Sequence, residues 1–467
     1  MDKYYLVFES EVPKYIQISR HIKKLIYSKK LLEGEKLPSI RELSKLLKVN
    51  TVTVVNAYDR LQIEGYAIQR IGSGTYAKSK EENKNFLKEY SNIYKRISNG
   101  ELKDYLDFTG ETTCSEFFPV NTFKEVLNKV IDRDGAEAFI HENAFGYDGL
   151  RNSINKYFWN YSIENENIII VSGAQQGIDI VAKAIINVND NIIVEKPTYS
   201  GALNVFKSRR ANIFEVDILK DGADISYLRK IIKKNKIKCF YLMSYFQNPT
   251  GSTYSTEKKK ELLNLAEEFD FYIIEDDYLS ELIYDKSIMY NSFKALDKND
   301  RVIYIKSFSK IFLPGIRMGY LISPEKFSDN IQECKINTDR TTSSLMQRAL
   351  DLYINEGYWK KHIKDLNKAY KERYTFMETS IREVLRDKVQ FNNPGGGLNF
   401  YLKISEDINM NCIELFNKCK KEKVIITPGV LFYKHSVDGE KYFRLGFSKT
   451  NNIEIKKGIG IIDKLLI

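Results

Sequence analysis

The sequence predicts an α/β protein with a small basic N-terminal domain and a larger body built around a mainly parallel sheet. The 467 residues are 43% hydrophobic and 29% charged, which is the balance of an ordinary globular chain. Positive charge gathers near the N-terminus, and beyond residue 107 short β-branched segments alternate with helical patterns. Such alternation is typical of a parallel sheet with helices on both faces.

The net charge of +10 is unevenly distributed. Residues 1–80 contain fifteen Lys and Arg against eight Asp and Glu, so this segment alone carries +7. An asymmetry of this kind indicates a polyanion-binding head on a nearly neutral body. The alternative interpretation is a chain that merely reflects a Lys-rich proteome.

Composition and spacing exclude several other classes of protein. The five cysteines are widely spaced, form no Cys-x-x-Cys pair and are accompanied by only four histidines, so neither disulfides nor a metal site is expected. No apolar run approaches the ~18 residues of a membrane-spanning helix, and the N-terminus has no apolar signal segment. We therefore expect a cytoplasmic protein without membrane contact.

Three helices and a hairpin are predicted in the head. Apolar residues recur at helical spacing from Lys14 to Ile26. Ser39, followed by Glu42, is typical of a capped helix start, and another helix is predicted from Asn50 to Gly65. The apolar face expected for that helix consists of Val52, Val55, Tyr58 and Leu61. Residues 66–70 and 75–77 flank a glycine-containing turn and predict a β-hairpin. The order is that of a winged helix-turn-helix.

The run from Pro13 to Thr75 resembles the winged domain of the GntR family of bacterial repressors. The resemblance is carried by Leu37-Pro38-Ser39-Ile40-Arg41-Glu42-Leu43, Thr53-Val54 and Gly72-Ser73-Gly74-Thr75, among other motifs. It implies double-stranded DNA contacts by the helix starts and the wing tip, from Ser39, Arg41, Asn50, Thr51, Thr53, Gly72, Ser73 and Gly74. The family often has Ser-Arg before the Thr-Val pair, and Asn50-Thr51 stands there instead. The alternative is a winged helix used only for protein contacts.

Two domains joined by a linker are predicted along the chain: a head at 1–78, a charged linker at 79–106 and the α/β body at 107–467. The linker lacks proline and offers little apolar surface, so we expect a tether that is partly helical. In the body, strands are predicted at 168–171, 192–194, 213–216, 239–243, 271–275, 302–305 and 320–322. Helices are expected from residue 343 to about 389, followed by a smaller C-terminal α/β subdomain.

Polar groups suited to pyridoxal phosphate (PLP) follow several of these strands. Lys310 comes after strand 302–305, where partial burial would free its amine to form a Schiff base. Asp276 can pair with a pyridinium nitrogen, and the glycine-rich turn 173–177 opens a helix whose N–H groups can hold a phosphate. All of these groups lie where open α/β sheets bind ligands. The predicted cofactor contacts are Ala174, Gln175, Tyr199, Asn248, Asp276, Tyr278, Ser307, Ser309, Lys310 and Arg317.

Together these segments resemble a fold-type I PLP-dependent transferase, similar to aspartate aminotransferase, over residues 107–467. The resemblance implies that Arg444 binds the carboxylate of an amino-acid ligand, since its planar guanidinium suits a carboxylate. Related domains also have a Tyr that reaches the phosphate held by the partner subunit. His141 stands at that position here, either as a replacement donor or as an ordinary surface residue.

The fusion of both parts resembles the MocR subfamily of GntR regulators, which includes GabR-like and PdxR-like members. The resemblance implies a homodimeric transcription regulator that binds an operator with two half-sites. Its body would hold PLP on Lys310 and sense an amino-acid-like compound or the vitamer itself. Full turnover as an enzyme is not expected, although a half-reaction is conceivable. Two alternatives remain open: a working aminotransferase with an accessory head, and a scaffold whose pocket is vestigial.

Overall fold

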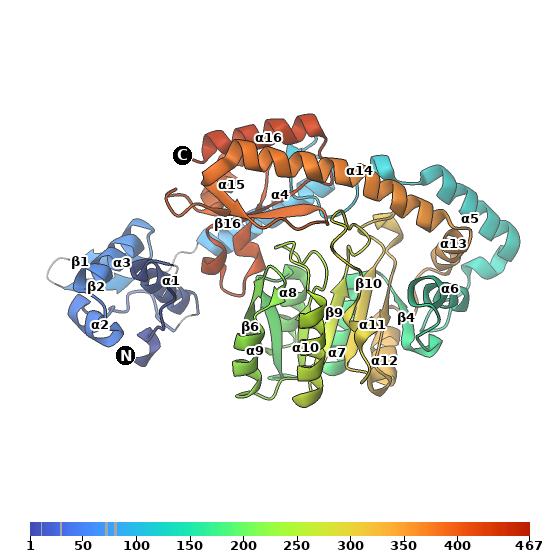
Figure 1. The fold of residues 1–467 in the computed structure, drawn as a ribbon, viewed down its shortest axis with the longest axis horizontal. Coiled ribbons are helices and arrows are strands. Elements are labelled where there is room, and N and C mark those ends of the chain that lie inside the picture. Colours follow the sequence, from blue (N-terminus) through green and yellow to red (C-terminus); the bar gives the residue numbers. More distant parts are fainter. Residues whose placement is uncertain (11, 29, 71–72, 79–81) are drawn as a thin grey trace. The chain divides into compact units, whose positions relative to one another are not determined.

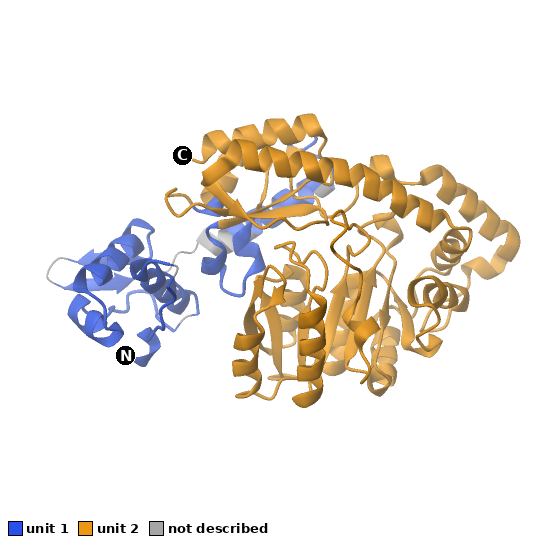
Figure 2. Cartoon of the chain, viewed as in Figure 1, with its two compact units in different colours: residues 1–105, 411–413, 428–441 blue, residues 106–410, 414–427, 442–467 orange. Residues whose placement is uncertain are grey.

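The computed structural model describes residues 1–10, 12–28, 30–70, 73–78 and 82–467. These residues form two compact units (Figure 2). One consists of residues 1–105 with 411–413 and 428–441, and the other of residues 106–410, 414–427 and 442–467. Within the described part of the chain, no helix is both long and apolar enough to cross a membrane.

The N-terminal residues form a winged helix-turn-helix, as the sequence predicted (Figure 1). Its elements are α1 (Lys14–Tyr27), α2 (Ile40–Leu47), α3 (Thr51–Ile63), β1 (Ala67–Arg70) and β2 (Gly74–Ala77). The two strands pair antiparallel, with Ala67 opposite Ala77, and form the wing. A capping box starts α2, because the Ser39 hydroxyl accepts from Glu42 N–H and the Glu42 carboxylate accepts from Ser39 N–H.

The apolar face predicted for α3 is wrong in its first turns. Val52 is 59% exposed, whereas Val54, Ala57, Tyr58 and Leu61 are buried. Valines and alanine lie on more than one side of this helix, so periodicity alone did not decide which side packs. Packing against α1 and α2 decides it and leaves Val52 in solvent at the start of the helix.

One basic residue of the head lies in its core. The Lys23 side chain is 2% exposed, and its ammonium pairs with Glu64 and, at 2.8 Å, with Oε2 of Glu440. The Tyr66 hydroxyl donates to the other Glu440 oxygen at 3.0 Å. Buried charges persist when they are paired in this way. Lys23 is therefore a structural cation and not part of a nucleic-acid surface.

The charged segment predicted as a linker contains helix α4 (Glu82–Ser98). Phe86 and Ile93 on this helix are 4% and 7% exposed. Two buried apolar side chains require a packing partner, so this segment packs more closely than its charge-rich composition suggested.

The body contains an eight-stranded sheet in the order β4-β11-β10-β9-β8-β5-β6-β7. Neighbouring strands from β10 through β9, β8 and β5 to β6 are parallel, while β11 and β7 run antiparallel to their neighbours. The predicted mainly parallel sheet is confirmed. Its strands are β4 (Ile168–Val171), β5 (Asn191–Lys196), β6 (Asn212–Leu219), β7 (Gly222–Ala223), β8 (Cys239–Leu242), β9 (Tyr272–Asp277), β10 (Val302–Ser307) and β11 (Gly319–Ile322).

Helices cover both faces of this sheet (Figure 1). Leu228 of α9 and Leu262 of α10 pack in one apolar cluster with Val302 of β10. Gly177 of α7 approaches Ile305 of the same strand. Because side chains alternate along a strand, residues 302 and 305 point to opposite faces. The helices of this part are α5 (Val120–Asp134), α6 (Asp148–Trp159), α7 (Ala174–Ile185), α8 (Ser200–Ser208), α9 (Ile225–Ile232), α10 (Thr256–Glu268), α11 (Phe293–Leu296) and α12 (Ser328–Asp339).

The C-terminal part forms the smaller α/β subdomain that the sequence predicted. A four-stranded sheet in the order β12-β13-β16-β15 is accompanied by the long helix α14, which lies beside α16 (Figure 1). A short parallel pair joins β14 to β3, with Val424 opposite Leu106. The elements are β3 (Leu106–Asp107), α13 (Ser344–Asn355), α14 (Tyr358–Ser380), β12 (Val389–Phe391), β13 (Asn399–Ile404), α15 (Cys412–Lys421), β14 (Val424–Ile425), β15 (Thr427–Pro428), β16 (Tyr442–Gly446) and α16 (Asn452–Leu465).

Candidate functional site

Three neighbouring strands bring Gly173, Ser307 and Arg317 to the same edge of the large sheet. In the ladder, Gly319 of β11 lies opposite Val171 of β4 on one side and opposite Ser307 of β10 on the other. Gly173 follows β4 and Arg317 precedes β11, and Arg317 Nη2 donates to the carbonyl of Ser172 at 2.9 Å. Register therefore gathers groups that are more than 130 residues apart in sequence.

Position 173 requires a glycine for two reasons: its backbone conformation and the close approach of Arg317. Its φ is +87°, and a Cβ atom there would lie 2.9 Å from Arg317 Nη2. Ala174 and Gln175 follow as the first residues of α7, where backbone N–H groups have no partner within the helix. The Tyr199 hydroxyl donates to Gln175 Oε1 at 3.1 Å. Glycine, arginine and helix start together form a cradle suited to a phosphate.

Ser307 and Ser309 are both buried at the end of β10. Ser309 Oγ contacts the Met318 carbonyl at 3.5 Å, which ties this segment to the loop that carries Arg317. Lys310, the next residue, is 25% exposed at its side chain. The amine is therefore held at the edge of the sheet but remains accessible.

Asp276 lies on β9, 2% exposed, with its two carboxylate oxygens in different environments. Oδ2 accepts from the Tyr241 hydroxyl at 2.6 Å. Among the residues that the structure describes, none donates to Oδ1. Burial raises the pKa of Asp276 to about 6, although the Tyr241 hydrogen bond opposes this. A buried acceptor without a donor is costly, so Oδ1 fits a ligand group that donates a proton.

The structure places Tyr278 and Asn248 in existing hydrogen bonds. Tyr278 donates its hydroxyl proton to the backbone carbonyl of Phe246 at 2.7 Å, and can still accept. Asn248, 2% exposed, accepts from Arg444 Nη1 at 2.7 Å through Oδ1. Asn248 is thus joined directly to the arginine that the resemblance assigned to a ligand carboxylate.

Arg444 and Lys310 meet at a carboxylate that sequence reasoning missed. Glu111 Oε1 accepts from Arg444 Nη1 in a short hydrogen bond, and Glu111 Oε2 accepts from Lys310 Nζ at 3.1 Å. Burial would raise the pKa of Glu111, but the charges of Arg444 and Lys310 outweigh it and hold that pKa well below its usual range. The sequence signal was slight: a Gly-Glu pair shortly after β3.

The residues present fit PLP on these observations. The cradle at Gly173 and Arg317 suits the phosphate, Asp276 Oδ1 awaits a donor such as a pyridinium N–H, and Lys310 supplies an accessible primary amine. Among the described residues, no group of His, Cys, Asp and Glu side chains could hold a metal ion.

The head presents most of its predicted DNA contacts to solvent. Arg41, Asn50, Thr51 and Ser73 are exposed, as is Gly74, and Thr53 is half-buried. Two of these side chains already cap helices: Ser39 caps α2, and Asn50 caps α3 by accepting from Val52 N–H at 3.0 Å. Gly72 lies outside the described residues.

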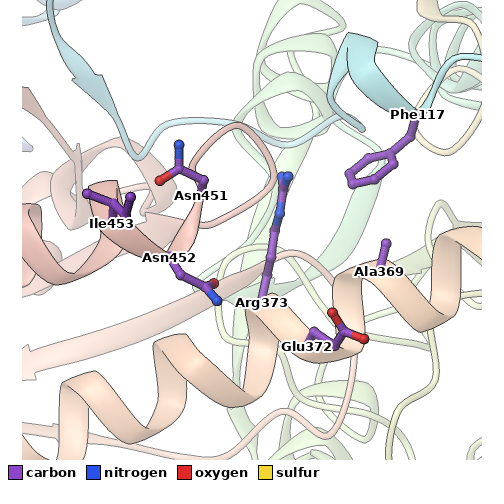
Figure 3. Close-up of a pocket in the computed structure, with 7 residues that line it drawn as sticks. All are labelled: Phe117, Ala369, Glu372, Arg373, Asn451, Asn452 and Ile453. Carbon is purple, nitrogen blue, oxygen red and sulfur yellow. The ribbon is translucent and has the colours of Figure 1, made fainter.

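Two further features stand apart from this constellation. His141 is exposed in the loop before α6. A surface hollow of about 440 Å³ is lined by Phe117, Arg373, Glu372 and Asn451, among others (Figure 3). The Arg373 guanidinium lies over the Phe117 ring at 4.9 Å and donates to the Ser448 carbonyl at 3.1 Å. None of the predicted cofactor contacts lines this hollow.

Comparison with known proteins matches both parts of the chain. Residues 114–462 match the aminotransferase class I and II family, and residues 14–77 match the gntR family of bacterial regulatory proteins. Aromatic-amino-acid aminotransferase 1 of Thermococcus litoralis is 30% identical over 77% of this chain and 87% of its own. The HTH-type transcriptional regulator YdfD of Bacillus subtilis is 27% identical over 96% of this chain and 95% of its own.

Among solved structures, the multiple substrate aminotransferase of Thermococcus profundus superposes with a TM-score of 0.75. It is 27% identical, over 80% of this chain and 94% of its own. Enzymes of this class depend on PLP, which agrees with the groups gathered at the sheet edge. The chain belongs to the aminotransferase class I and II family and carries, ahead of that domain, a GntR-type winged helix-turn-helix.

Proposed function

We propose that this chain is a DNA-binding transcription regulator whose aminotransferase-like body holds PLP and senses an amino compound or PLP itself. One observation carries the proposal: a GntR-type winged head with exposed polar side chains at its helix starts is fused to a body of the aminotransferase class I and II family. Catalysis has no use for such a head. The uncharacterized HTH-type transcriptional regulator YdfD matches nearly the full length of the chain.

In this proposal, different residues of the body bind different parts of the cofactor. Lys310 would form the covalent link, Asp276 would accept a hydrogen bond from the pyridinium N–H, and Tyr199 would stack on the ring. Ser307, Ser309 and Arg317 hold the phosphate together with the N–H groups of Ala174 and Gln175, and Asn248 and Tyr278 face the ring hydroxyl. When bound, PLP supplies an electrophilic carbon at which a ligand amine replaces the lysine amine.

The head and the assembly complete the proposal. The division is 1–78 for the head, 79–106 for the connecting segment and 107–467 for the body. The protein binds as a homodimer to two half-sites, with Arg41 and the start of α3 on the DNA. His141, which is exposed, stands where related domains have a Tyr that reaches the phosphate of the partner subunit.

A working aminotransferase is the second candidate function. It is favoured by the accessible Lys310 amine, whose charge lowers the pKa of Asp276, and by the 30% identity to an aromatic-amino-acid aminotransferase of Thermococcus litoralis. Release of a 2-oxo acid from an L-amino acid, in many turnovers per protein, would distinguish this function from sensing.

Selection of bound duplexes from a random pool, with the intact PLP-loaded protein, tests the regulator. We expect an enriched sequence with two half-sites, and an affinity whose logarithm falls linearly with log salt at about −0.9 per phosphate contact. Titration with amino compounds, followed by visible absorbance of the cofactor, tests sensing. If the selection enriched no sequence, the proposal that the protein is a transcription regulator would be refuted.

A further inference from the structure

Glu111 lies where a ligand's carboxylate would meet Arg444. One of its oxygens contacts Arg444 Nη1 and the other contacts Lys310 Nζ. The Glu111 side chain is 22% exposed, and that of Arg444 only 2%. A ligand entering the pocket therefore encounters the Glu111 carboxylate before the guanidinium.

The terminal nitrogens of Arg444 are already engaged within the chain. Nη1 donates to Glu111 and to Asn248 Oδ1, and Nη2 donates to the Thr109 carbonyl at 3.1 Å and to Thr427 Oγ1 at 3.3 Å. Bidentate capture of a ligand carboxylate needs two free guanidinium N–H groups on one edge. Such a ligand would have to displace Glu111 and leave that carboxylate without its arginine partner.

We propose that Glu111 is a specificity-determining residue that fills the carboxylate subsite of Arg444, so that the pocket selects primary amines lacking an α-carboxylate over α-amino acids. This inference rests on the proposed function, because the amine is recognised at the cofactor. It names the ligand class: a primary aliphatic amine, attracted to Glu111 as an ammonium ion.

The charges of the pocket support this selection. In the chain without cofactor, the charges of Arg444 and Lys310 hold the pKa of Glu111 well below its usual range, so its carboxylate is ionised. A second carboxylate at the same guanidinium would face a fixed like charge, which is unfavourable. An ammonium ion approaching Lys310 instead meets Glu111 Oε2, which attracts it. When the Lys310 amine is in its covalent link to PLP, Arg444 still pairs with Glu111, so Glu111 acts by electrostatics and not by carrying a proton.

The test compares two ligands that differ only by the carboxylate: 1-propylamine and L-2-aminobutyrate. Each is titrated into the PLP-loaded protein at one pH, and the visible absorbance gives two apparent dissociation constants. In the unmodified protein we expect propylamine to bind more tightly. In Glu111→Gln we expect their ratio to shift about tenfold toward aminobutyrate, which corresponds to roughly 1.4 kcal/mol.

The matched control is Glu372→Gln, which removes the same charge at the surface hollow (Figure 3). It should leave the ratio unchanged. Glu111→Asp is a second test in case the glutamine variant fails to fold: the shorter side chain cannot reach both cations, so the ratio should shift in the same direction by less. An unchanged ratio in every folded Glu111 variant overturns the proposal.

A cofactor-free measurement separates this inference from the proposed function. Propionate, a carboxylate without an amine, is titrated calorimetrically into protein stripped of PLP. We expect binding to Glu111→Gln and none to the unmodified protein. If PLP gives no absorbance band at all, the proposed function fails, while the propionate result still decides whether Glu111 fills the carboxylate subsite. Equal propionate binding to both proteins refutes it.

Discussion

The Tyr241 hydroxyl on β8 donates to Asp276 Oδ2 on the adjacent strand β9 at 2.6 Å. Tyr241 is fully buried, so this bond fixes the carboxylate in one orientation, and none of the described residues donates to Oδ1. Asp276 is thereby positioned by a neighbour that sequence reasoning did not identify.

Replacing Tyr241 by Phe should therefore affect both stability and cofactor affinity. Leaving Asp276 Oδ2 buried without its donor costs about 1–3 kcal/mol in the free energy of unfolding, measurable by chemical denaturation. PLP affinity, followed by absorbance, should fall moderately in Tyr241→Phe. It should fall further in Asp276→Asn, because an amide cannot supply the negative charge. Unaltered PLP binding by Asp276→Asn would contradict the role given to this carboxylate.

The buried carboxyl of Glu195 should make stability depend on pH. Burial raises its pKa from 4.5 to about 8, despite hydrogen bonds from Tyr254 and Gln247. Between these values the folded chain keeps a proton that the unfolded chain has lost, so the free energy of unfolding falls as pH rises from about 4.5 to about 8. The slope is at most roughly 1.4 kcal/mol per pH unit.

Glu195→Gln should flatten that part of the curve, since the amide does not titrate. Denaturation at a series of pH values measures it, with the exposed Glu137→Gln as the control. A slope that persists in Glu195→Gln would assign the effect to other groups.

Lys310→Ala should abolish the covalent attachment of PLP without unfolding the protein. Under the proposed function, the Lys310 amine forms the covalent link, whereas Arg317, Ser307 and Asp276 should retain the cofactor reversibly and more weakly without it. Mass spectrometry after borohydride treatment should find cofactor on the unmodified chain and on the exposed Lys298→Ala control, and none on Lys310→Ala. In a reporter assay the variant should stay in one regulatory state. Normal regulation by Lys310→Ala would show that the pocket is not the sensor.

Most of the fold followed from local sequence patterns. Runs such as Ile168–Val171 and Val302–Ile305 are rich in β-branched residues and fully buried, as expected for strands of a covered sheet. Patterns were less informative where apolar residues lie on several sides of a helix, as with Val52 on α3. They were also less informative on α4, where Phe86 and Ile93 are buried within a segment rich in charged residues.

Only those residues of the candidate site that belong to recognisable sequence motifs could be predicted. Lys310, Asp276, Arg317 and Arg444 stand in recognisable segments at strand ends. Glu111 and Tyr241 do not, because their importance lies in contacts across the fold: Glu111 meets Arg444 over 333 residues of sequence. A single carboxylate after a glycine has no spacing pattern that identifies such a contact.

Arg41→Ala should weaken DNA binding and leave cofactor binding unchanged. Arg41 is exposed in the first turn of α2, and none of the cofactor contacts lies in the head. If it contacts a phosphate, the slope of log affinity against log salt should become shallower by about 0.9. Arg96→Ala, which removes an exposed arginine from α4, is the control. Loss of the cofactor's absorbance in Arg41→Ala would contradict the separation of the two functions.

Two substitutions of Ser39 should separate its two roles, because its hydroxyl caps α2 and is also placed among the predicted DNA contacts. Ser39→Ala removes the cap and should lower the free energy of unfolding of the head by about 0.5–2 kcal/mol, whereas Ser39→Gly costs only a few tenths of a kcal/mol because glycine is tolerated at this position. Both variants lose the hydroxyl. If Ser39 donates to a phosphate, DNA affinity should fall equally in both, and if it acts only as a cap, Ser39→Gly should bind DNA as the unmodified protein does. Thermal unfolding and DNA titration at fixed salt measure the two effects side by side. Weaker DNA binding in Ser39→Ala alone would remove Ser39 from the DNA contacts and leave Arg41 as the principal contact of α2.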